Sequence, residues 1–72
     1  MTDTKLLNEF IAKSGLKKRW IAETMGLSPY GLTLKINNTS KFYVNEVQLL
    51  CHILNITSLK DKERIFFADY VA

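Results

Sequence analysis

Residues 21–37 constrain the fold of this chain more than any other stretch. They read IAETMGLSPYGLTLKIN, which predicts two short helices joined by a tight turn at Gly26. The two helices must cross at a steep angle within three or four residues, so the turn needs a positive φ, which glycine adopts without steric cost. Ala22 must be small because the second helix packs closely over it. This spacing is typical of a helix-turn-helix.

The residues around the turn support this interpretation. Ser28 can cap the second helix, and Pro29 suits its first position, where a missing N–H costs nothing. The small core between the two helices is expected to contain Ile21, Met25, Leu27, Leu32 and Ile36. Each residue is weak support alone, but together at this spacing they favour a helix-turn-helix.

The rest of the chain predicts further short helices and no strand. Glycines and polar clusters divide the helical periodicity into pieces, and no period-two alternation bounded by hairpin turns occurs. The expected helices cover residues 4–14, 17–25, 28–38, 44–54 (with Asn45 as a cap) and 58–71 (with Ser58 as a cap). We therefore expect residues 1–72 to form a single all-α domain, a compact bundle of five short helices.

Apolar side chains at helical spacing predict the core. The expected inward-facing residues outside the turn are Leu6, Leu7, Phe10, Ile11, Val47, Leu50 and Leu54. Trp20 is expected to pack partly buried rather than to stack on bases. Phe66 and Phe67 cannot both face one narrow core stripe, so core packing and contact with a partner both remain open for this pair.

Several functional classes are disfavoured by what the chain lacks. No apolar run approaches the length of a membrane span, and the start of the chain does not resemble a signal peptide, so a cytoplasmic protein is expected. Cys51 lies in an apolar run and is expected in the core, whereas His52 has no metal-ligand partner at suitable spacing. Phosphate-binding loops and nucleophile motifs are absent. We expect no enzyme activity, metal, cofactor or small-molecule substrate.

The positive charge is concentrated in the first part of the chain. Residues 1–41 carry seven Lys/Arg against three Asp/Glu, whereas residues 42–72 carry three against four. A polyanion could use the resulting field, and so could an acidic protein partner.

The stretch LSPYGLTLKINN, followed by Phe42, Glu46-Val47, Ile53-Leu54 and the closing FFA, carries a family resemblance. It resembles the Cro/CI-type helix-turn-helix family, whose fold is lambda-repressor-like, and in particular short phage regulators of the lysis/lysogeny switch. The resemblance extends from about Leu6 to Val71. It implies a regulator in the host bacterial cell that binds double-stranded operator DNA. Because a module this small makes few DNA contacts alone, the resemblance also implies a homodimer that binds two half-sites.

The resemblance also implies which residues meet DNA. Lys18 would touch a phosphate, helped by Lys17 and Arg19, although a merely solvated basic run also remains open. Lys35 departs from the usual apolar residue, and its ammonium is expected to reach solvent or phosphate. The residues expected to face the major groove are Ser28, Pro29, Tyr30, Thr33, Leu34 and Asn37.

The outward stripe of the second helix leaves two hypotheses open. Arg, Lys, Asn and Gln are the best readers of base edges, and this stripe offers only Asn37. Tyr30 and Leu34 beside a basic rim instead resemble a small protein interface. The chain is therefore expected either to bind operators as a Cro-like protein or to act as an anti-repressor. The anti-repressor would bind the cognate phage repressor and alter its DNA binding.

Overall fold

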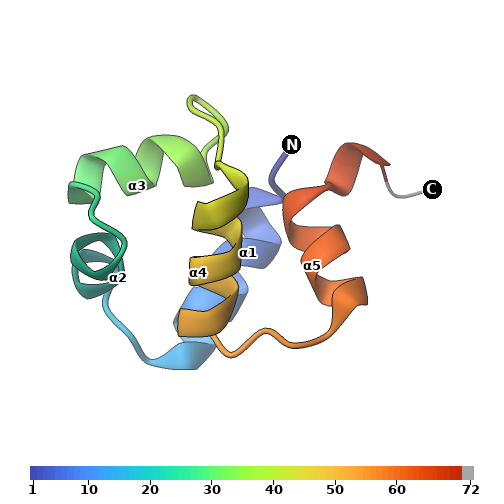
Figure 1. Cartoon of the computed structure of the whole chain (residues 1–72), viewed down its shortest axis with the longest axis horizontal. Coiled ribbons are helices and arrows are strands. Elements are labelled where there is room, and N and C mark those ends of the chain that lie inside the picture. The colour runs from blue at the N-terminus through green and yellow to red at the C-terminus, as the bar shows by residue number, and fades with distance from the viewer. Residues whose placement is uncertain (71–72) are drawn as a thin grey trace.

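The computed structural model describes residues 1–70, which form five α-helices followed by a short 3₁₀ helix (Figure 1). The elements are α1 (Thr4–Ser14), α2 (Lys18–Thr24), α3 (Pro29–Ile36), α4 (Val44–Ile53), α5 (Leu59–Phe66) and the 3₁₀ helix η1 (Ala68–Tyr70). No strand occurs in this part of the chain, so the all-α prediction is confirmed. In Figure 1, α2 and α3 lie at one end of the molecule and α5 lies at the other.

Each of the five α-helices contributes buried hydrophobic residues to the core. Leu7 and Ile11 of α1 meet Leu32 and Ile36 of α3 and Ile65 of α5 in one cluster. The other buried hydrophobic residues are Ile21, Ala22, Leu50, Cys51, Leu54, Ile56 and Phe66. Leu6, Phe10, Met25, Leu27 and Val47 pack partly buried against this cluster. Helical spacing therefore identified most of the buried residues of the helices, whereas the buried Ile56, which lies between α4 and α5, was not predicted.

Three helices end in the same hydrogen-bonded motif, with a left-handed residue just beyond the helix. After α2, Gly26 has φ 73°, and Leu27 N–H donates to the carbonyl of Ala22 at 2.8 Å. Asn38 after α3 and Asn55 after α4 occupy the equivalent position with φ 66° and 56°. Asparagine tolerates this conformation better than other side-chain-bearing residues, so it can occupy the position that glycine occupies after α2.

The start of α4 differs from the prediction. Asn45 lies inside the first turn, and the flanking residue is Tyr43, whose side chain makes no capping bond. Its backbone N–H donates instead to the Glu46 carboxylate at 2.8 Å. Glu46 thus stabilises the start of α4 from within its first turn. Its negative charge also interacts favourably with the positive end of the helix dipole.

The last helix is shorter than predicted. It ends at Phe66, because Phe67 leaves helical geometry with φ −128° and ψ 40°. The following N–H, of Ala68, donates to the carbonyl of Met1 at 3.1 Å instead of continuing α5. Val71, the predicted end, lies outside the described residues.

The two adjacent phenylalanines face different environments. Phe66 is buried, with its ring edge-on to Phe42 at 5.6 Å between centroids, whereas Phe67 is 44% exposed. Trp20 is more exposed than predicted, at 49%, because Ile21 and Ala22 occupy the buried side of α2. Within residues 1–70, no helix is long and apolar enough to cross a membrane.

Candidate macromolecule-binding face

The first turn of α2 presents three cationic side chains to solvent. Lys17, Lys18 and Arg19, which we name the α2 basic cluster, are all exposed. Arg19 approaches Glu23 at 3.4 Å, but the two side chains are 81% and 62% exposed, so this pair contributes little to stability. No ion pair within residues 1–70 engages Lys17 or Lys18. These two cations can therefore meet an external anionic group.

The turn between α2 and α3 fixes the angle at which the two helices meet. Ala22 is fully buried, and α2 packs against α3. The N–H of Gly26 donates to the carbonyl of Glu23, and that of Leu27 donates to Ala22. Ser28 then starts α3, because its hydroxyl oxygen accepts the N–H of Gly31 at 2.9 Å. The expected positive φ of Gly26 and the expected cap at Ser28 are confirmed, and Ala22 is buried.

One side of α3 faces solvent. We name Pro29, Tyr30, Thr33 and Asn37 the α3 face; all four residues are exposed, Tyr30 at 71%. Two nearby hydroxyls are used within the helix itself. That of Ser28 caps α3, and that of Thr33 donates to the carbonyl of Pro29 at 3.1 Å. The largest solvent-facing group of α3 is therefore the Tyr30 ring.

The Lys35 ammonium, which was expected to reach solvent or phosphate, is instead bound within the protein. Its ammonium lies 2.9 Å from the Glu46 carboxylate and 2.9 Å from the carbonyl of Lys41, and it sits 4.7 Å from the centroid of the Tyr43 ring. The Lys35 side chain is only 11% exposed. This lysine therefore joins α3 to α4 and is not free to contact an external phosphate.

Glu46 is the acidic partner that the sequence analysis did not identify as important. Burial opposes its ionisation and is the largest single effect, but the Tyr43 N–H and the Lys35 ammonium together outweigh it. The pKa of Glu46 therefore lies below its ordinary value of 4.5. The one available signal was its position three residues after Tyr43, as in a capping box.

Leu34 is half-buried rather than outward-facing. Its carbonyl accepts two N–H groups from the following loop, from Thr39 at 2.9 Å and from Ser40 at 3.1 Å. The loop backbone is therefore bonded to the last turn of α3. Asn37 stays exposed as the last residue of the predicted set.

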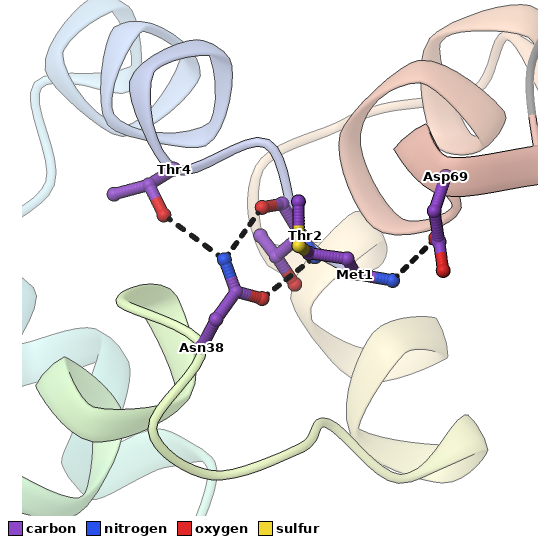
Figure 2. Close-up of polar contacts among 5 residues, drawn as sticks. All are labelled: Met1, Thr2, Thr4, Asn38 and Asp69. Carbon is purple, nitrogen blue, oxygen red and sulfur yellow. Dashed lines mark hydrogen bonds and ion pairs between the residues drawn. The ribbon is translucent and has the colours of Figure 1, made fainter.

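The residue after Asn37 has a role that the sequence analysis missed. The carboxamide of Asn38 binds both backbone polar groups of Thr2, as Figure 2 shows: its oxygen accepts the N–H and its nitrogen donates to the carbonyl, each at 2.8 Å. The hydroxyl of Thr4 donates to the carbonyl of Ile36 at 2.6 Å. The end of α3 is thus bonded to the first residues of the chain.

Among residues 1–70, no three His, Cys, Asp or Glu side chains lie together as metal ligands would. Cys51 is buried, and burial raises the pKa of its thiol, an effect that the charge of Lys62 only partly offsets. Comparison of the chain with protein-family models, with curated proteins and with solved structures gave no match.

Proposed function

We propose that this chain is a regulator of a phage-type lysis/lysogeny switch in the bacterial cytoplasm, and that α2 and α3 act as a helix-turn-helix whose exposed face binds the cognate repressor protein. The observation that carries this proposal is the composition of the α3 face. It presents an exposed tyrosine and a proline, while Lys35 is bound to Glu46. Such a face suits a protein partner better than base edges.

The energetics of recognition support a protein partner. Specific reading of bases relies on Arg, Lys, Asn or Gln, and on α3 only Asn37 remains exposed for this purpose. Tyrosine is enriched among the residues that dominate protein interfaces, and truncating such a residue costs about 2 kcal/mol or more. The α2 basic cluster would form the charged rim and steer association with acidic groups on the repressor.

Operator binding by the same face is the second candidate function. The observation that favours it is the α2 basic cluster, in which Lys17 and Lys18 have no ion pair within residues 1–70. Residues 1–41 carry the excess of positive charge, which a DNA backbone would attract. In this alternative the chain acts as a Cro-like protein, as a homodimer over two half-sites.

A titration of the purified chain against three targets separates the two candidates. The targets are its own operator region, the isolated repressor and the repressor–operator complex, each at low and physiological salt. The proposal predicts saturable binding to the repressor with a modest salt dependence. The alternative predicts binding to DNA alone, with affinity falling steeply as salt rises, by a log–log slope of about −0.9 per phosphate contacted.

Two pairs of variants assign the effect to the proposed face. Tyr30→Ala should weaken repressor binding by about 2 kcal/mol, whereas Leu59→Ala, which truncates an equally exposed residue on α5, should leave it unchanged. Under the alternative, Lys18→Ala weakens DNA binding and Lys60→Ala does not. Equal affinities for Tyr30→Ala and Leu59→Ala would exclude the α3 face as the repressor contact.

A further inference from the structure

Asn38 fixes the end of α3 through bonds that reach across the whole chain. Its carboxamide forms a pair of hydrogen bonds with the backbone of Thr2, both at 2.8 Å, and its nitrogen also lies 3.4 Å from the Thr4 hydroxyl (Figure 2). This arrangement resembles the pairing of two strand residues, with the side-chain amide in place of a peptide group. Thr2 is 7% exposed whereas Asn38 is exposed, so the pairing is part-buried.

Residues 1–4 are themselves bonded to the opposite end of the molecule. The N–H of Asp3 donates to the carbonyl of Ile65 at 2.7 Å, and the N–H of Ala68 donates to the carbonyl of Met1. Figure 2 also shows the Met1 ammonium at 2.6 Å from Asp69. We name residues 1–4, which are bonded to the end of α3 on one side and to α5 and η1 on the other, the N-terminal seam. Through the seam, the C-terminal end of α3 is held by α5, with which it shares no direct hydrogen bond within residues 1–70.

We propose that Asn38 is a positioning residue for the α3 face: by binding the N-terminal seam it holds the C-terminal end of α3, and with it Asn37, in the orientation in which this face meets its partner. The inference rests on the proposed function, because it concerns the same face. It applies equally to a repressor and to an operator, since both would contact Asn37.

The loop between α3 and α4, residues 37–43, is also held by Lys35, and comparison with this contact shows what restraint Asn38 provides. Lys35 holds the loop from the side of α4 through the carbonyl of Lys41. Asn38 holds it from the side of α1 and α5. Without the Asn38 side chain, the Thr4 hydroxyl would still bind the carbonyl of Ile36, and Thr39 and Ser40 would still bind the carbonyl of Leu34. Residues 37–40 would lose the two 2.8 Å bonds to Thr2 and would be held less firmly on the side of α1, so a partner would have to order that side on binding. Ordering a loop at the moment of binding lowers affinity.

The chain contains a matched control for this proposal. Asn38 and Asn55 both follow a helix in the left-handed conformation and both close the same backbone motif. Of the two, only Asn38 has a side chain that forms hydrogen bonds within residues 1–70. Glycine favours the left-handed conformation, so Asn38→Gly and Asn55→Gly both keep the backbone motif, and only Asn38→Gly removes the bonds to the seam.

The experiment measures two quantities on the wild-type chain, on both glycine variants and on Ile65→Val. Ile65→Val lowers stability at the seam without changing any hydrogen-bonding group. The first quantity is amide hydrogen exchange of residues 37–40 in the free protein, followed by NMR. The second is affinity for the repressor and for operator DNA, measured at a temperature where all four proteins are folded.

The proposal predicts faster exchange at residues 37–40 and an affinity loss of about threefold to tenfold for Asn38→Gly alone. Ile65→Val should unfold at a lower temperature than the wild type but bind with the same affinity. Unchanged exchange in Asn38→Gly, or faster exchange with unchanged affinity, would overturn the positioning role. If the wild-type chain binds neither target, the proposed function fails, and exchange alone then decides whether Asn38 holds the end of α3.

Discussion

Gly26 illustrates how much one residue can determine in a chain of 72 residues. Its φ of 73° places it in the left-handed region, and a Cβ built there would meet no atom within 4 Å. Any penalty for another residue at this position is therefore backbone strain and not a clash. Because the turn sets the angle between α2 and α3, that strain would act on the candidate binding face as well as on stability.

We predict that Gly26→Ala lowers the free energy of unfolding by about 1 kcal/mol, since alanine disfavours the left-handed conformation. Gly26→Asn should cost less, because asparagine already occupies the equivalent position at Asn38 and Asn55. Urea unfolding followed by circular dichroism measures both values. Equal losses for alanine and asparagine would show that something other than φ determines the cost.

At the scale of elements, the connection between α3 and α4 depends on one charged pair. Lys35 and Glu46 are 11% and 13% exposed, and the carboxylate also accepts the N–H that starts α4. The pair thus links the candidate binding helix to the next helix and completes the start of that helix. Removing either charge would leave the other largely shielded and without its partner.

The pH dependence of stability should report this pair. The pKa of Glu46 in the folded chain lies below its ordinary value of 4.5, so its carboxylate stabilises the fold at neutral pH, and this contribution disappears as the pH falls through the lower, folded value. In Glu46→Gln the side chain cannot titrate. We predict that the wild type exceeds this variant by about 1 to 2 kcal/mol at pH 7 and that the difference shrinks below pH 4.5. A difference that stays constant on acidification would contradict the assignment.

Helix positions were predictable, because their signals are local. Ser28-Pro29 and Gly26 act within one turn of the boundary that they set, and the apolar spacing identified the buried faces. The contacts of Lys35 and Asn38 were not predictable in this way. Lys35 binds Glu46, which is 11 positions away in the sequence, and Asn38 binds Thr2, which is 36 positions away. No periodicity encodes such pairs. The Lys35 ammonium, expected at solvent or a phosphate, therefore binds Glu46 instead, and Asn38, expected only near the end of a helix, also binds Thr2.

The same distinction explains the end of the chain. The apolar pattern of residues 58–71 favours a longer helix, but the Ala68 N–H bonds to Met1 and ends the helical geometry. A helix boundary set by a residue at the other end of the sequence leaves no local signal. The two phenylalanines at this boundary consequently lie in different environments, one in the core and one at the surface.

At the scale of the whole molecule, Phe66 and Phe67 mark the boundary between the core and the surface. Phe66 is 5% exposed and Phe67 is 44% exposed. We predict that Phe66→Ala lowers the free energy of unfolding by about 3 to 5 kcal/mol, which would unfold much of a domain this small. Phe67→Ala should cost about 1 kcal/mol or less, in proportion to its smaller buried area. Thermal and urea unfolding measure both, and comparable losses would place Phe67 in the core.

The N-terminal seam also affects the order in which the molecule can be completed during synthesis. Residues 1–4 are synthesised before their partners at positions 65–69. A nascent chain that ends before α5 can form α1, α2 and α3 from local signals, yet it has nothing to hold its own beginning in place. We therefore expect the end of α3 to become rigid only after residues 65–69 have been synthesised, so the candidate binding face would mature later than the helices that carry it.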